Sequence, residues 1–213
     1  RLYIDPYTGV VLKKGLYNTK SIKANTINLL NLICLCPDMD NLRLNKKIQE
    51  ETELFFGLHS DEFLLPFSKY FLRSDYKLYL QAVATTMMLK DWIEEKREDE
   101  ICEKFSIGPG DIRRLVDLAT WLIFSSQELA RLFKINSLIL ELKKLSTRIK
   151  YGVKEELLSL VKLKEVGRVR SRALYNSGIK RPADLKKVKI ERLMKIANIG
   201  KKIATKIKSQ VEG

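Results

Sequence analysis

The chain has 213 residues, and 45% of them are hydrophobic, which is enough to bury a core in two folding units. Its formal charge of +14 is unevenly spread, because residues 151–213 carry 17 Lys and Arg against 6 Asp and Glu, whereas residues 1–150 carry 23 against 20. This distribution favours nucleic acid as a partner, and the absence of any apolar run of about 18 residues argues against a membrane protein.

Residues 1–20 contain Pro6 and Gly9 and predict a short extended segment that is too small for a domain. The periodicity is helical from Ser21 onward. The expected helices cover residues 22–35, 46–56, 75–95, 99–105, 111–133 and 137–150. Gly152 then interrupts the pattern, which predicts a helical bundle over residues 21–150 and a small helical module over residues 151–213.

Few residues suit a metal site. The three cysteines (Cys34, Cys36 and Cys102) are odd in number and have no second pair at zinc spacing, so we expect neither a disulfide framework nor a metal. His59, the single histidine, has no obvious partner and is expected to be a surface residue or a satisfied structural one. No signal peptide opens the chain, and we expect a soluble, cytoplasmic protein without a membrane partner. Because the chain starts at Arg1 rather than Met, we expect a piece of a longer protein.

The helix expected over residues 111–133 carries two residues that its packing does not require. Its apolar face follows the spacing i, i+3, i+4, i+7. That face consists of Ile112, Leu115, Val116, Ala119, Leu122, Ile123 and Ala130. Arg114 and Trp121 fall about 140° away from the centre of this face and lie roughly 10 Å apart along the axis. Trp121 is either packed under another helix or, as we expect, forms with Arg114 a stacking platform for nucleotide bases.

A short pattern occurs twice near the end of the chain. Residues 163–174 read LKEVGRVRSRAL and residues 196–207 read IANIGKKIATKI. Each copy predicts a turn that ends in glycine and leads into an amphipathic helix with a basic first turn. Such a helix N-terminus favours an anion, so two copies can hold two phosphates of one nucleic-acid backbone. The pattern resembles the double helix-hairpin-helix module of DNA-repair proteins.

Several longer stretches resemble one helicase family. They are KDWIEEK (90–96), DEIC (99–102), IGPGDIRRLVDLATWL (107–122), RIKYGVKEELL (148–158) and GRVRSRALYNSGI (167–179). Together they resemble the C-terminal half of the archaeal superfamily 2 DNA repair helicase of the Holliday-junction-migration (Hjm) type, which is related to human helicase Q. The opening YIDPYTG (3–9) resembles the end of that family's winged-helix domain.

The resemblance implies an all-α fold in which residues 1–20 are the tail of a removed winged-helix domain, residues 21–150 a bundle with a ratchet helix at about 111–133, and residues 151–213 a helix-hairpin-helix domain. Arg114 and Trp121 match the ratchet residues that contact the translocating single strand. The hairpin positions expected to contact DNA are Gly167, Arg168, Val169, Arg170, Arg172, Gly200, Lys201, Lys202 and Lys206. The implied protein is archaeal and associated with the nucleoid.

The implied function is a DNA-binding accessory region that grips single-stranded, forked or branched DNA. Its partners would be that DNA, the motor and winged-helix domains of the same parent, and replication or repair proteins. The chain lacks the phosphate loop G-x-x-x-x-G-K-[ST], so no catalytic residue, no metal and no cofactor is expected in it. ATP and Mg²⁺ are expected only in the missing motor domains.

The hairpin copies depart from the common pattern, which has glycine two residues before the glycine retained here. Glu165 and Asn198 stand at those places, where a left-handed backbone is expected; Asn adopts it more readily than Glu. Two other functions stay open. One is a repair glycosylase or nuclease, for which Asp184 is the only candidate acid, although its Pro-Ala-Asp-Leu context favours a helix cap. The other is a bundle that recruits a replication clamp or a single-strand-binding protein.

Overall fold

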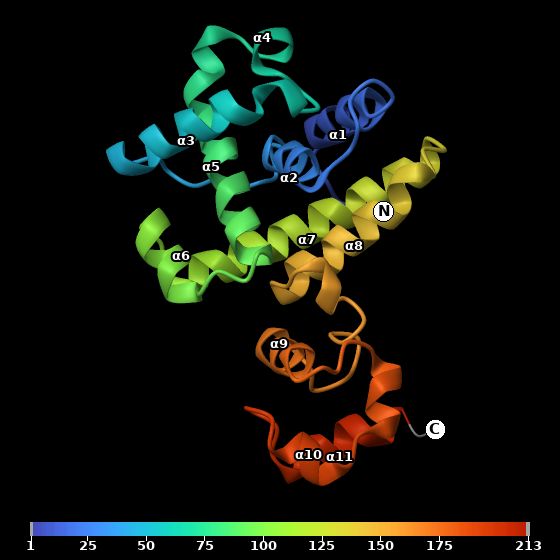
Figure 1. Cartoon of the computed structure of the whole chain (residues 1–213). Coiled ribbons are helices and arrows are strands. Elements are labelled where there is room, and N and C mark those ends of the chain that lie inside the picture. The colour runs from blue at the N-terminus through green and yellow to red at the C-terminus, as the bar shows by residue number, and fades with distance from the viewer. Residues whose placement is uncertain (1, 212–213) are drawn as a thin grey trace. The chain divides into compact units, whose positions relative to one another are not determined.

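The structure is a computed structural model that describes residues 2–211, so Arg1 and residues 212–213 of the expected terminal segments lie outside it. The described chain forms two compact units (Figure 1). The first contains residues 2–92 and 96–150, and the second contains residues 93–95 and the chain from Tyr151 onward.

Every regular element between residues 2 and 211 is helical, which confirms the predicted all-α fold class. In chain order the α-helices are α1 (Pro6–Asn18), α2 (Thr26–Cys34), α3 (Lys46–His59), α4 (Phe67–Tyr70), α5 (Tyr76–Ile93), α6 (Glu98–Phe105), α7 (Pro109–Leu132), α8 (Ser137–Tyr151), α9 (Arg168–Asn176), α10 (Ile190–Met194) and α11 (Lys201–Ser209). Single 3₁₀ turns connect some of them. Among the described residues no helix combines the length and apolar character that crossing a bilayer requires.

The prediction of an extended N-terminal segment is wrong, because α1 forms there. Asp5 is the N-cap and its side chain accepts a hydrogen bond of 2.7 Å from the backbone N–H of Tyr7. Pro6 takes the first helical position, where its missing N–H costs no hydrogen bond and its fixed φ suits a helix. The proline that is expected to interrupt the segment therefore starts a helix.

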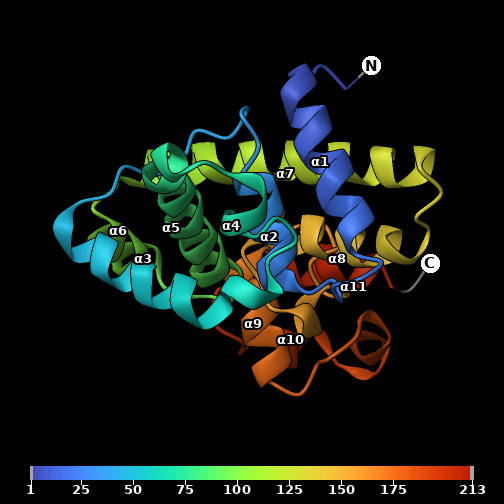
Figure 2. The same ribbon diagram turned by 90° about the horizontal axis from the view of Figure 1, so that it is seen from above.

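Helix α1 packs into the first unit against α2 and α7, as Figure 2 shows for its crossing of α7. Leu12 and Leu16, one helical turn apart, are fully buried. Gly15 allows the close approach to α2, because a Cβ at this position would lie 2.2 Å from a methyl carbon of Leu32. Part of the expected 1–20 tail thus contributes to the core of the first unit.

Side-chain caps explain where other helices begin. The Asn25 side chain accepts a hydrogen bond from the backbone N–H of Asn28, and the Asn28 side chain accepts one from the backbone N–H of Asn25, so α2 begins at Thr26 rather than at the expected Ile22. Asn45 caps α3 in a similar way through the N–H of Ile48.

The cysteines and the histidine, for which the sequence predicts no metal site, pack against protein groups. Cys34 and Cys36 are buried, and burial raises the pKa of the Cys34 thiol to about 12. His59 pairs with Glu62, and the centroid of its ring lies 4.2 Å from that of Phe55, which supplies the partner that the sequence does not reveal.

The second unit has its own apolar core. It is built from both hairpin copies and the helices that join them. Its fully buried members are Val153, Leu157, Leu160, Leu174, Leu185, Leu193, Ala204 and Ile207. The short helices of this unit, five to nine residues long, are therefore held by burial rather than by their own propensity.

Candidate nucleic-acid interface

Helix α7 is the longest helix of the described chain and positions the first candidate surface. Gly108 is its N-cap and Pro109 its first residue, while the Asp111 carboxylate accepts a hydrogen bond of 3.0 Å from the N–H of Gly108. This hydrogen bond, together with Arg114 nearby, holds the pKa of Asp111 below its usual value. The local sequence therefore fixes where the helix starts and which residues face each side.

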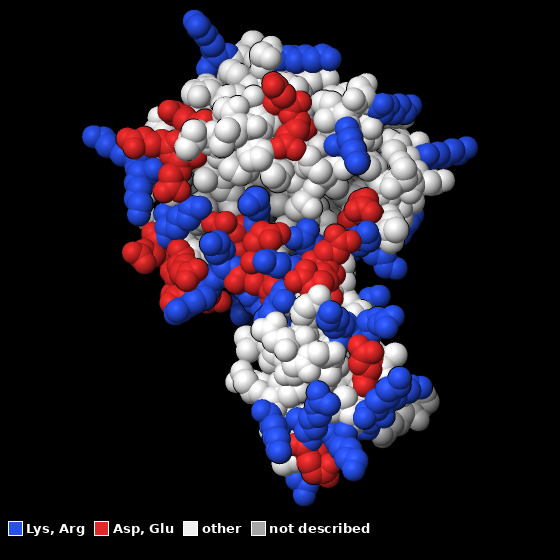
Figure 3. Space-filling view, in the orientation of Figure 1, with Lys and Arg blue, Asp and Glu red and all other residues white. Residues whose placement is uncertain are grey.

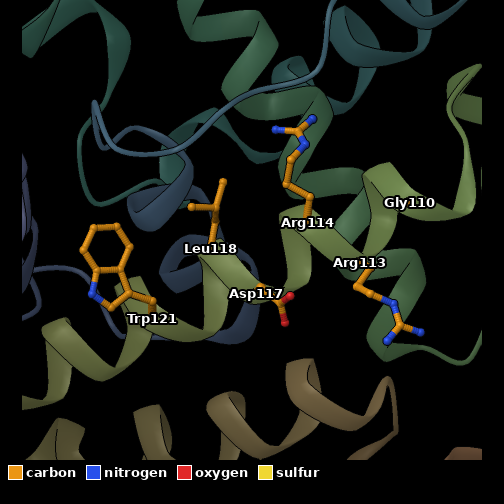
Figure 4. A pocket seen from close by; sticks show the side chains of 6 residues that line it. All are labelled: Gly110, Arg113, Arg114, Asp117, Leu118 and Trp121. Carbon is orange, nitrogen blue, oxygen red and sulfur yellow. The ribbon is translucent and has the colours of Figure 1, made fainter.

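The predicted apolar face of α7 is confirmed, because all seven of its members are buried. Arg114 is exposed and Trp121 is partly buried, so both lie away from that face. Arg114, Leu118 and Trp121 follow each other at four- and three-residue spacing, and Figure 4 shows their side chains rising from one side of the helix. Leu118 was missed in the sequence, although helical spacing places it between the other two.

These side chains line a groove of about 540 Å³. Gly110, Arg113 and Asp117 complete its lining. A second groove of about 490 Å³ shares Arg114 with the first and continues along the segment that joins α2 to α3, where Arg43 is exposed. Both grooves together could accommodate an extended chain along α7, with apolar surface beside positive charge.

Protein groups contact both candidate residues in the structure. The Nε1–H of Trp121 donates a hydrogen bond of 3.2 Å to the backbone oxygen of Leu2, and its ring lines the groove. Arg114 forms an ion pair with Asp40 and a longer contact of 3.5 Å with Asp111. Asp40 comes from a segment 74 residues away in the chain, so no helical pattern could have identified it.

The second candidate surface is formed by the two glycine turns. Glu165 and Asn198 both have left-handed backbones, with φ of 69° and 63°, as their places in the pattern predict. An equivalent hydrogen bond closes each turn. The N–H of Val166 donates to the backbone oxygen of Leu163 at 3.1 Å, and the N–H of Ile199 donates to that of Ile196 at 3.2 Å. The two copies therefore have the same local structure despite the absence of glycine at the left-handed position.

Gly167 and Gly200 are the N-caps of α9 and α11, and neither helix start is capped by a side chain. Their φ angles of −95° and −79° suit any residue, and a Cβ on either glycine would meet no heavy atom within 4 Å. Neither the backbone nor packing within the unit requires glycine here. Each glycine therefore leaves the start of its helix without a capping side chain.

The side chains around these turns differ in their surroundings. Lys201 and Lys202 are exposed at the start of α11, and Val169 is exposed at the start of α9. Figure 3 shows basic side chains with few acidic ones over the visible face of this unit. The others have acidic partners or neighbours. Arg168 and Val169 line a groove of about 480 Å³ that also contains Glu94 and Glu95.

Arg172 is engaged within the unit. Its guanidinium pairs with Glu95 and, at 2.8 Å, with Glu156; the hydrogen bond that it donates to Glu95 and the second carboxylate raise its pKa. Arg170 and Lys206 also have internal partners. Arg170 donates to backbone oxygens of Glu165 and Asn198, and Lys206 lies 2.6 Å from the Glu165 carboxylate, whose pKa this contact lowers.

Asp184, the candidate acid of a glycosylase, caps a short 3₁₀ turn (Pro182–Lys187). Its carboxylate accepts hydrogen bonds of 3.0 and 2.9 Å from the N–H groups of Lys180 and Arg181. A carboxylate occupied in this way has a structural role, which agrees with its sequence context.

Comparison with known proteins shows which families the two parts of the chain match. Residues 27–152 match the family described as archaeal helicase, domain 4, which covers more than half of the chain. The chain belongs to this family. Residues 155–212 match the SAM-like helix-hairpin-helix tandem. The resemblance to an archaeal helicase in the sequence is thereby confirmed, and α7 lies entirely within the archaeal helicase domain.

Three similar proteins carry the name ATP-dependent DNA helicase Hel308. The chain is 35% identical over 207 residues to that of Pyrococcus abyssi, 36% over 204 residues to that of Thermococcus kodakarensis and 36% over 214 residues to that of Methanocella arvoryzae. These matches cover 95%, 95% and 99% of the chain. The chain spans only 28%, 18% and 29% of the respective relatives.

Proposed function

We propose that this chain is the DNA-binding accessory region of an ATP-dependent DNA repair helicase. In this proposal α7 holds bases of the translocating single strand through Arg114 and Trp121, and the two glycine turns hold backbone phosphates. Hydrolysis of ATP with Mg²⁺ takes place in motor domains of the parent protein. The names of the similar proteins, each an ATP-dependent DNA helicase, support this assignment.

The observation that carries the proposal is the Arg114–Leu118–Trp121 side of α7. An indole ring and a guanidinium, separated by two helical turns and lining one groove, offer surfaces on which bases stack without readout of their identity. A translocating strand needs such contacts, because every base must be held and then released. Base–aromatic stacking is worth about 1–3 kcal/mol, which is strong enough to hold a strand transiently.

The glycine turns complement this side of α7. Two open helix N-termini and the exposed Lys201 and Lys202 suit phosphates, which are the same in every nucleotide. Base contacts on the bundle and phosphate contacts on the hairpins together would grip a strand without sequence preference. Forked or branched DNA, which presents single strands at a junction, is the substrate class that we propose for the parent.

Competition binding tests the proposal. A fluorescent single-stranded oligonucleotide is bound to the chain, and unlabelled single-stranded or duplex DNA of the same length is added. We expect single-stranded competitor to displace the probe at a lower concentration than duplex, because duplex bases are not available for stacking on Trp121. Equal competition by duplex DNA would show that phosphates alone are recognised and would remove the role of α7.

A further inference from the structure

Arg170 links the two glycine turns. Its Nη1 donates a hydrogen bond of 2.7 Å to the backbone oxygen of Glu165, and its Nε donates one of 3.0 Å to the backbone oxygen of Asn198. These two acceptors belong to the left-handed residues of the two copies, 33 positions apart in the chain. One guanidinium therefore binds equivalent carbonyl groups in both turns.

These bonds fix the peptide groups that precede the cap glycines. A carbonyl and the following N–H belong to one planar unit, so holding Glu165 O orients the N–H of Val166, and holding Asn198 O orients that of Ile199. Both N–H groups are bonded on their other side to Leu163 and Ile196. Each peptide plane is thus held at both ends, one residue before the glycine where a phosphate would approach.

A second set of contacts ties the first turn to α11. The Glu165 carboxylate lies 2.6 Å from Nζ of Lys206. Gln210 exchanges two hydrogen bonds with the backbone of Lys164, of 2.7 and 3.2 Å. The first turn is therefore joined to the second hairpin copy by side chains on both sides.

We propose that Arg170 is a positioning residue that sets the spacing between the two turns, rather than a phosphate ligand. Because this spacing is fixed before binding, a nucleic-acid backbone meets the starts of α9 and α11 already at the right distance from each other. No entropy is then lost in aligning the two turns on binding. The consequence for DNA binding rests on the proposed function, whereas the link between the turns does not. Lysine cannot replace arginine here, because a single ammonium lacks the planar fork that reaches both carbonyls.

The test compares Arg170→Lys, Arg170→Ala and the control Lys201→Ala in the full chain, first without DNA. Hydrogen exchange of the Val166 and Ile199 amides is followed by NMR. We expect both Arg170 variants to exchange faster by on the order of tenfold in both turns, and Lys201→Ala to exchange like the parent. Native exchange rates in Arg170→Ala would overturn the proposal.

Binding of single-stranded DNA is then measured over a range of salt concentrations. Lys201→Ala should reduce the slope of log affinity against log salt by about 0.7, the effect of one lost phosphate contact. Arg170→Lys should weaken binding with the slope unchanged, because its charge is kept. If Arg170→Lys binds like the parent, the positioning role is excluded. If no variant, nor the parent chain, binds DNA, the proposed function fails, while the exchange rates still decide the role of Arg170.

Discussion

Arg114 of α7 is ion-paired with Asp40, a residue of the segment between α2 and α3, at the edge of the groove that contains Trp121. The side chains of the two residues are 44% and 69% exposed. An ion pair this exposed is worth only about 0.2–1 kcal/mol, so a phosphate or a stacked base can displace Asp40. The pair holds the Arg114 guanidinium beside the groove.

Replacing Asp40 by Asn should therefore strengthen binding of single-stranded DNA. We expect a gain of up to about fivefold in affinity, because the competing ion pair and one negative charge are removed together. Asp117→Asn is the matched control, since Asp117 lines the same groove and its side chain points away from Arg114 (Figure 4). An equal gain in both variants, measured by fluorescence anisotropy, would mean that only the overall charge of the groove matters.

Gly200→Ser separates stability from phosphate binding in the second hairpin. Serine is a favoured N-cap, and its Cβ meets no atom within 4 Å, so the melting temperature should stay the same or rise. Its hydroxyl takes the N–H groups that a phosphate would use, and affinity for DNA should fall about tenfold. Gly57→Ser in α3, which is exposed and has equal space, should leave DNA binding unchanged. Undiminished binding by Gly200→Ser would contradict the phosphate role of this helix start.

The left-handed backbone of the turn residues should make stability depend on the residue at these positions. Asn198 has φ of 63°, a conformation that costs alanine about 1 kcal/mol more than glycine. Asn198→Ala should lower the free energy of unfolding by about 1 kcal/mol, and Asn198→Gly should leave it equal or slightly higher. Lys195→Ala, three residues earlier at an exposed right-handed position, should change it by less than about 0.5 kcal/mol. Chemical denaturation measures all three, and equal effects of Ala and Gly would refute the strain argument.

The ion pair of Glu165 with Lys206 makes the stability of the second unit depend on pH in the acid range. The hydrogen bond from Lys206 lowers the pKa of Glu165 in the folded chain. Its contribution to stability is therefore complete above the usual glutamate pKa of about 4.3 and is lost as pH falls through the lower, folded value. Glu165→Gln should remove this part of the loss of stability in acid. At pH 7–8 the slope of its denaturation curve should equal that of the parent chain. An unchanged acid profile would show that the pair contributes nothing.

Helical spacing alone was enough to predict the face of α7 that is buried and the shared side of Arg114 and Trp121. The left-handed turns were also predictable, because the repeat aligns Glu165 and Asn198 with a place that favours glycine. Both features depend on residues that lie close together in the chain, where backbone geometry determines the outcome.

Contacts between distant residues could not be predicted in this way. The pairing of Asp40 with Arg114 and the two acceptors of Arg170 depend on tertiary packing, which helical spacing and the repeat do not reveal. Helix α1 was missed for a local reason. Proline usually breaks a helix, whereas the cap at Asp5 makes Pro6 the first residue of α1.

The central claim is that bases of a single strand stack on Trp121, and the most direct measurement compares Trp121→Ala and Trp121→Phe with the parent chain. Anisotropy with a labelled single-stranded oligonucleotide is recorded at two salt concentrations. We expect Trp121→Ala to lose about 1–3 kcal/mol of binding free energy with no change in the salt slope, and Trp121→Phe to retain most of it. Equal affinities of all three proteins would contradict the claim and leave the glycine turns as the sole DNA contacts of this chain.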